Sequence, residues 1–187
     1  MNDVRHRNSL SKLLRVSIAG VAVCLMVVAG ASAASASGST VGFGFHASDI
    51  SGFTGAGSVA LNGGGAFAAG AATMHGGGGF SCTANVGTGF LTGCLQGEGV
   101  RWDTAALLTG TTFKCTGSLS EAPKTLSTSA DTVVVQADFY RAGDANDESF
   151  TAQMIVSTQD IAKDIPGVQN VWVQSVGCGT ATVHFGA

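Results

Sequence analysis

The stretch TVVVQADFYRAGDANDESFTAQMIVS, Thr132 to Ser157, decides the fold class. Its two arms, 132–141 and 149–157, are rich in β-branched and aromatic residues, and the second arm alternates apolar with polar side chains. The residues between the arms are polar and include a glycine, which is typical of the loop of a β-hairpin. The stretch therefore predicts two antiparallel strands joined by an acidic tip.

The rest of residues 98–187 continues this pattern of regular strands. Further strands are predicted at 98–103, 111–118 and 170–185, the last of them a single strand or a hairpin. One short helix is predicted within 157–167, where Ser157 would be the N-cap and Asp160 would close a capping box. We therefore expect an all-β domain, an antiparallel β-sandwich or barrel stabilised by disulfides, with at most one short helix.

Residues 38–80 differ from the rest of the chain because they are rich in glycine. They hold 14 glycines and one acidic residue, and neither Lys nor Arg. Disordered segments are poor in apolar groups, whereas this one carries Phe, Val and Leu at intervals. Two similar sequences, NGGGAF at 62–67 and HGGGGF at 75–80, each end in a Phe that closely follows a glycine run. We predict short strands joined by glycine turns; a phosphate-binding loop is the alternative, but the Lys-Ser/Thr that should follow the glycines is missing.

The N-terminus carries a predicted secretory signal peptide. Basic residues precede an apolar run of 14 residues, 16–29, and small residues follow it. We expect cleavage after Ala33, with Ala36 as the alternative, so that 1–33 is the leader and 34–187 a single exported domain. The apolar run is shorter than the roughly 20 residues that span a bilayer, so no permanent membrane anchor is expected. The protein is predicted to be secreted, or to reside in the periplasm or cell envelope.

The exported chain is predicted to be acidic. Removal of the leader leaves five basic and eleven acidic residues, a net charge of −6. An acidic surface repels phosphate backbones and lacks the Lys and Arg that displace counterions from nucleic acids. Nucleic acid is therefore not an expected partner, and the expected partner is an unknown ligand or a component of the envelope.

The cysteines predict two disulfides. Cys24 leaves with the leader, and an even number remains in an exported chain: Cys82, Cys94, Cys115 and Cys178. Three pairings are open, of which we favour Cys82 with Cys94 and Cys115 with Cys178. A zinc site is weakly supported because the chain has no C-x-x-C pair. A thiolate of Cys178 paired with the imidazole of His184 is the chemical alternative, but on one strand they would stand about 20 Å apart.

The acidic tip is the candidate metal site. Asp144, Asn146, Asp147 and Glu148 offer three carboxylates and one amide, and calcium prefers such oxygen ligands. The spacing lacks the glycine and the final Glu of an EF-hand loop, and turns are polar simply because their backbone is solvated. The sequence favours a solvated turn, with a calcium site as the alternative. We expect no other cofactor.

Two further groups of residues carry candidate chemistry. Glycosidic catalysis needs two carboxylates, which would come from Glu98, Asp103, Glu121 and Asp138, but their spacing does not predict that they meet. Arg101 and Asp103 flank Trp102. A surface ion pair over a buried Trp102 is favoured over a carbohydrate platform built on an exposed indole ring.

The sequence thus favours a non-enzymatic extracytoplasmic module that binds a ligand or serves a structural role. A small secreted hydrolase that acts through carboxylates on an envelope or extracellular substrate is the alternative. A self-associating coat component is a third hypothesis, because the segment 38–80 could present sheet edges. The catalytic residues, if any, and the oligomeric state are left open.

Overall fold

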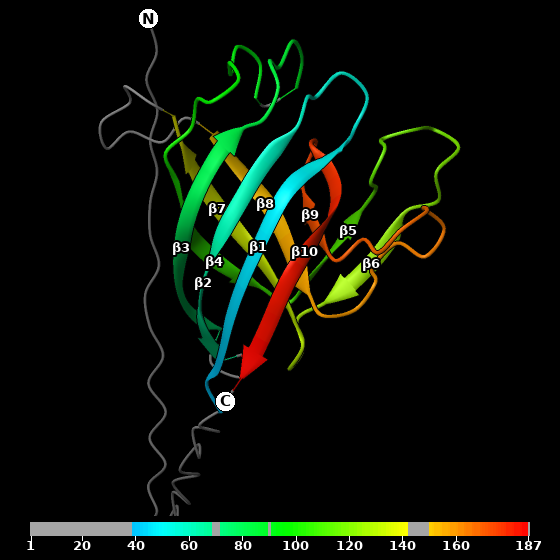
Figure 1. The fold of residues 1–187 in the computed structure, drawn as a ribbon. Coiled ribbons are helices and arrows are strands. Elements are labelled where there is room, and N and C mark those ends of the chain that lie inside the picture. The colour runs from blue at the N-terminus through cyan, green and yellow to red at the C-terminus, as the bar shows by residue number, and fades with distance from the viewer. Residues whose placement is uncertain (1–38, 69–71, 90, 142–149, 187) are drawn as a thin grey trace, which may run out of the picture. The chain divides into compact units, whose positions relative to one another are not determined.

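The computed structural model describes residues 39–68, 72–89, 91–141 and 150–186, and within them the protein is all-β (Figure 1). Eight strands form a closed barrel in which all neighbours are antiparallel, in the order β1-β10-β9-β8-β7-β4-β3-β2. The barrel strands are β1 (Val41–Gly52), β2 (Val59–Ala68), β3 (Thr73–Cys82), β4 (Arg101–Leu108), β7 (Thr132–Tyr140), β8 (Phe150–Ser157), β9 (Val171–Val173) and β10 (Gly177–Gly186). The strands β5 (Gly110–Phe113) and β6 (Lys124–Ser127) form a separate two-stranded sheet. The predicted fold class is confirmed, and the barrel is the architecture adopted.

The hairpin that led to this prediction is formed by β7 and β8. Their register runs from Thr132 opposite Ser157 to Phe139 opposite Phe150. Alternate residues of β7 point into the barrel, and Val133, Val135 and Phe139 are fully buried there. The local alternation of side chains therefore predicted both the strands and the face that is buried.

The barrel interior is packed with aromatic rings. Phe139 lies between Phe80 and Phe150, with ring centroids 5.4 Å and 4.8 Å away. A second group near the other end of the barrel is Phe43, Phe67 and Phe185, whose centroids are 5.8 to 6.2 Å apart. Such separations are typical of stacked and edge-to-face aromatic pairs in a close-packed core.

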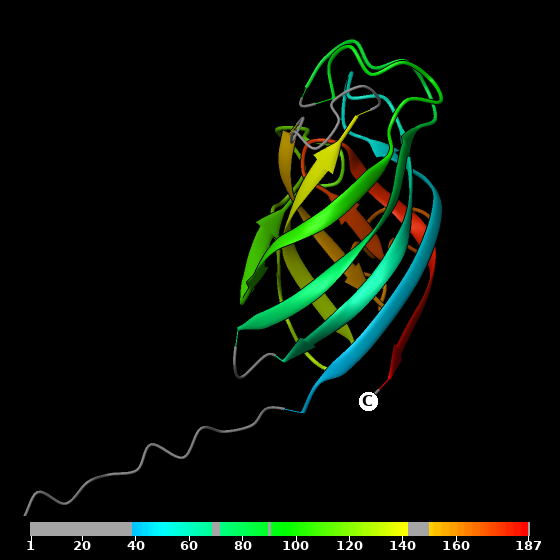
Figure 2. The ribbon, with the colours of Figure 1, turned by 90° about the vertical axis from the view of Figure 1, so that its left-hand side faces the viewer.

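The two glycine runs lie inside strands and pair with each other, so the prediction of glycine turns is wrong for these runs, whereas Gly55 does lie in the turn between β1 and β2. Gly63, Gly64 and Gly65 of β2 stand opposite Gly78, Gly77 and Gly76 of β3. A Cβ atom on Gly78 would lie 1.9 Å from the carbonyl oxygen of Asn62. We call β1, β2 and β3 the glycine wall; their tilted strands cross the side of the barrel that faces the viewer in Figure 2. Close approach of backbones, rather than chain reversal, requires glycine here.

The opposite side of the barrel consists of β7, β8 and β9, and we call it the covered wall because it is buried on both faces along 132–135, 154–157 and 171–173. Outward-facing Val134, Ile155 and Trp172 join a second apolar cluster with Phe113 of β5. The β5–β6 sheet lies outside the barrel on this side (Figure 1). A strand buried on both faces is a continuous apolar run, which explains the sequence VVV at 133–135.

The predicted helix within 157–167 does not form. Ser157 is the last residue of β8, and the following segment consists of bends and turns. The Asp160 carboxylate accepts a hydrogen bond from the N–H of Gln169 at 3.2 Å, and the N–H of Ile161 donates to the Gln169 carbonyl at 2.6 Å. The polar side chain expected to cap a helix thus closes a loop instead, and Ile161 is buried in the second cluster.

Both favoured disulfides are confirmed. Cys82 is bonded to Cys94 and Cys115 to Cys178, 12 and 63 residues apart in the sequence. The first closes a local loop after β3, and the second joins the segment after β5 to β10. Two intramolecular disulfides are consistent with an oxidising, extracytoplasmic compartment.

The C-terminal half of β10 has an open edge. Beyond Gly179 the side chain of Asn170 takes the place of a neighbouring strand, because it accepts from the N–H of Ala181 at 2.7 Å and donates to its carbonyl at 2.9 Å. Backbone groups alternate in direction along a strand, so those of Val183 and Phe185 point the same way as those of Ala181. Among the described residues they have no hydrogen-bond partner on that side.

Candidate functional site

The acidic tip with Asp144, Asn146, Asp147 and Glu148 lies outside the described residues, so calcium binding there stays a prediction. In the part of the chain that the structure does describe, no group of three or more His, Cys, Asp or Glu side chains could hold a metal ion. The remaining candidates for a site are the other carboxylates, the aromatic side chains and the pockets.

Glu121 is held by a ring of donors. Its two carboxylate oxygens accept the N–H groups of Cys115 at 2.7 Å and Thr116 at 2.8 Å, and the hydroxyl of Thr116 at 2.6 Å. The ammonium of Lys124 lies 3.0 Å away and also contacts Asp164 at 2.8 Å. Burial alone would raise the pKa of Glu121, but these hydrogen bonds outweigh it and lower the pKa to about 2. Glu121 is therefore a structural carboxylate that fixes the loop at the Cys115–Cys178 disulfide.

The carboxylate of Glu98 is likewise held by a hydrogen bond and an ion pair. It accepts the N–H of Leu95 at 2.8 Å and lies 3.3 Å from the guanidinium of Arg141. The hydrogen bond from Leu95, opposed by partial desolvation and aided by Arg141, holds the pKa of Glu98 below its usual value. A general acid needs the opposite shift, because it must be protonated near neutral pH.

The other two candidate carboxylates, Asp103 and Asp138, are brought together. They are directly opposite each other in the register of β4 and β7, on the outer face of the barrel. Arg101 binds Asp103 at 3.0 Å, and the Thr151 hydroxyl donates to Asp138 at 3.0 Å. Like charges opposite each other destabilise a sheet, and these two contacts offset that repulsion.

Trp102 is a core residue, as the sequence favoured. It is fully buried, and its indole N–H donates to the carbonyl of Asn62 at 2.9 Å. Arg101 pairs with Asp103 on the opposite face and lies over the ring of Tyr140 at 4.1 Å. The carbohydrate platform on this ring is therefore ruled out.

The pairing of Cys178 with His184 is ruled out as well. The sulfur of Cys178 is bonded to Cys115, and both half-cystines are buried. His184 lies six positions along β10 on an exposed part of the strand. A disulfide sulfur carries no thiolate, so this pair has no nucleophile.

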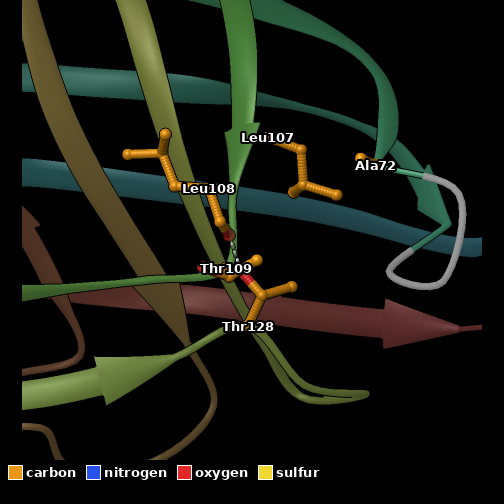
Figure 3. Close-up of a pocket in the computed structure, with 5 residues that line it drawn as sticks. All are labelled: Ala72, Leu107, Leu108, Thr109 and Thr128. Atoms are coloured by element: carbon orange, nitrogen blue, oxygen red, sulfur yellow. Dashed lines mark hydrogen bonds between the residues drawn. The ribbon is translucent and has the colours of Figure 1, made fainter.

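A small apolar pocket lies where β4 ends (Figure 3). Leu107 and Leu108, with Ala72, Thr109 and Thr128, line about 110 Å³. The Thr128 hydroxyl donates to the Leu108 carbonyl at 2.6 Å and accepts the N–H of Val134 at 3.1 Å, so its polar atoms are already used. Ligand pockets measure roughly 300 Å³ or more, which makes this pocket too small for a ligand of ordinary size.

A larger groove of about 330 Å³ lies on the outer face of the covered wall, and we call it the amide groove. Its floor comes from outward-facing side chains of β8 and β9 and the residues after β9, and its sides from β5 and two loops. The groove is lined by Phe53, Thr112, Phe113, Lys114, Gly117, Pro123, Gln153, Trp172, Gln174 and Ser175. None of these residues is a carboxylate.

Two glutamines of the amide groove are oriented by bonds to their oxygens. Gln174 Oε1 accepts the N–H of Gln153 at 3.0 Å, and Gln153 Oε1 accepts the hydroxyl of Thr111. Sequence reasoning missed both, because each is an ordinary polar residue that faces outward. The alternation in TAQMIVS indicated that Gln153 faces outward, but not which loops would enclose it.

The comparisons identify no relative. No model of a known protein family matches the chain, and no curated protein or solved structure matches it. Among the described residues, the structure contains no helix of the length and hydrophobicity that crossing a membrane requires. Function has to be inferred from the side chains and geometry of this chain.

Proposed function

We propose that this protein is an exported, non-enzymatic binding module whose ligand occupies the amide groove. The proposal is supported by the difference between the barrel interior and the amide groove. The barrel interior is filled by aromatic side chains, whereas the groove on the outer wall combines aromatic surface with amide donors. A concave, partly aromatic surface with a few oriented polar groups is typical of a binding site.

The supporting framework is rigid. The groove borders the segment after β5, which the Cys115–Cys178 disulfide and the contacts of Glu121 hold against the barrel. Thr54 also binds this segment, since its N–H donates to the carbonyl of Thr116 at 3.4 Å. Side chains held in place before binding lose little entropy when a ligand arrives, which favours recognition.

A hydrolase is the second candidate, and the juxtaposition of Asp103 and Asp138 is the observation that favours it. The two carboxylates lie on a sheet face, and their partners Arg101 and Thr151 occupy them. Asp103 and Asp138 would have to exchange these partners for a substrate before they could act as acid and base.

The experiment is a co-sedimentation of the exported protein with insoluble cell-wall polysaccharide and peptidoglycan, followed by an assay of released reducing ends. The binding module predicts that protein is retained by at least one material and that no reducing ends appear. Release of reducing ends that Asp103→Asn abolishes would establish the hydrolase instead. Failure to bind any material would contradict the binding module.

A further inference from the structure

The donors of the amide groove are available to a ligand. The bonds that orient Gln153 and Gln174 use their amide oxygens, and among the described residues neither Nε2 group has a partner. Neither nitrogen is sealed from solvent, because among the described residues neither Nε2 atom is a buried side-chain atom that lacks a hydrogen bond. Each amide therefore presents two N–H donors in a fixed orientation.

The aromatic part of the groove is held equally firmly. Phe53 is half-buried, and its ring covers Gly117, where a Cβ atom would come within 2.3 Å of the ring. Trp172 packs against Phe113 with ring centroids 5.4 Å apart, and its indole N–H donates to the Lys114 carbonyl at 2.9 Å. Both rings are buried, with Phe113 3% and Trp172 4% exposed, so Phe53 supplies most of the aromatic surface that a ligand could touch, and the indole offers no free donor.

The charges around the groove select the kind of ligand. No carboxylate lines the groove, so a cation finds no counter-charge there. Lys114 is the one charged lining residue, and its ammonium already donates to the carbonyl of Ser118 at 2.9 Å. The exported chain is expected to carry a net charge of −6, which disfavours anions at long range.

An acceptor group suits this arrangement better than a hydroxyl. A carbonyl oxygen has two lone pairs and no hydrogen, so one carbonyl can accept from both glutamines, whereas a hydroxyl placed there would also bring a donor between two donors. The N–H of the same acyl amide must find its acceptor elsewhere, in solvent or in a backbone carbonyl. A buried donor without a partner costs more than an average hydrogen bond contributes. An acyl methyl group beside the carbonyl would contact the ring of Phe53 and the small exposed part of the Trp172 indole.

We infer that the amide groove binds an uncharged ligand carrying an acyl-amide carbonyl beside an apolar face, of which an N-acetylated sugar is the extracellular example. This inference rests on the proposed binding function and names its ligand class. Gln153 and Gln174 donate to the carbonyl, and the ring of Phe53 contacts the acyl group.

The test is a calorimetric titration of the exported protein with N,N′-diacetylchitobiose, and with cellobiose as the matched sugar that lacks acetamido groups. Binding of the first and not the second is expected, with a change in the fluorescence of Trp172, the tryptophan that lines the groove. Equal affinity for the two sugars would overturn the inference.

The decisive variant is Gln174→Glu, which keeps an oxygen to accept the N–H of Gln153 and replaces the free N–H₂ group by a second oxygen. Loss of a donor and repulsion of the carbonyl are expected to weaken binding by at least about tenfold. Gln96→Glu is the control, because it makes the same change on an exposed residue outside the groove. Its affinity should equal that of the parent protein.

The outcomes separate this inference from the proposed function. If the protein binds cell-wall material but not diacetylchitobiose, or if Gln174→Glu binds diacetylchitobiose as tightly as the parent, the ligand class is wrong and the binding module stands. If it binds neither the sugar nor any cell-wall material, both fail. Thermal unfolding of each variant shows whether a loss of binding reflects a loss of fold, and Gln153→Glu provides a second, independent removal of a donor.

Discussion

The glycine wall and the covered wall are opposite solutions to the closing of one barrel. On the glycine wall, Gly63 and Gly78 let the backbones of β2 and β3 approach, and a Cβ atom on Gly63 would meet the indole of Trp102 at 2.9 Å. On the covered wall, Val134 and Ile155 are fully buried on the outer face as well. The glycine wall is close-packed because its backbones touch where side chains are absent. The covered wall is close-packed because side chains fill the space on both of its faces.

The two walls should therefore be destabilised by opposite changes: the glycine wall by added side-chain atoms, and the covered wall by the removal of side-chain atoms. Added atoms cannot be accommodated where backbones already touch, because protein interiors have few voids. Removed atoms or cross-links harm the covered wall, because its outer face is protected only by a small sheet and two loops.

Gly78→Ala should be the most damaging substitution. Its Cβ atom would lie 1.9 Å from the Asn62 carbonyl oxygen and 2.5 Å from the Cα atom of Gly63. We expect a loss of about 5 kcal/mol or more, comparable to the whole stability of a small domain, seen as a failure to fold. Gly87→Ala is the control, since a Cβ atom there meets nothing within 4 Å, and its unfolding free energy should hardly change. A stable Gly78→Ala protein would refute the close pairing of the glycine runs.

The β5–β6 sheet and the segment that follows β5 lie on the covered wall, and we call them the cover. The Cys115–Cys178 disulfide should contribute most to holding this cover against the barrel. Replacing both cysteines by alanine opens a loop of 63 residues and should cost about 4 kcal/mol on the chain-entropy account. Replacing Cys82 and Cys94, which close a loop of 12 residues, should cost about 3 kcal/mol. Denaturant unfolding of the two double variants measures the difference. The reverse order would show that the cover is held chiefly by its apolar contacts.

Glu121 should make the cover sensitive to acid. Its pKa of about 2 in the folded protein lies below the value of 4.5 expected without these contacts, so its stabilisation is full above about pH 4.5 and is lost as the pH falls towards 2. We expect the loss to be about 2 to 3 kcal/mol. Urea unfolding at pH 7 and pH 3 should show a smaller pH effect for Glu121→Gln than for the parent protein. An equal pH effect in both would mean that other carboxylates carry it.

Val183→Pro should have the smallest effect, although proline usually disrupts strands. The N–H of Val183 points to the open edge of β10, and proline is tolerated where a strand edge has no partner. We expect a change in unfolding free energy of less than about 1 kcal/mol. Val135→Pro is the contrasting variant, because Val135 lies in the middle of β7 between two paired strands, and it should prevent folding. Unfolding of Val183→Pro at room temperature would show that this edge is paired.

The sequence predicted local features well and contacts between distant segments poorly. The hairpin at 132–157, the presence of two disulfides and the buried Trp102 follow from alternation, cysteine number and flanking charges, whereas the pairing of the cysteines was one of three that the sequence left open. The helix at 157–167 was wrong because a capping pattern does not reveal that Asp160 binds Gln169. The amide groove could not be predicted, because its floor and its sides come from segments far apart in the chain.

By itself the sequence determined that this protein is an all-β domain with two cross-links, since a period of two residues and the count of cysteines are properties of the chain alone. Only the tertiary structure decided that the glycine runs face each other, that the sheet closes into a barrel, and that Gln153 and Gln174 share a groove. The physical reason is that register and closure depend on which distant strands meet, and that choice is made by packing the whole core at once.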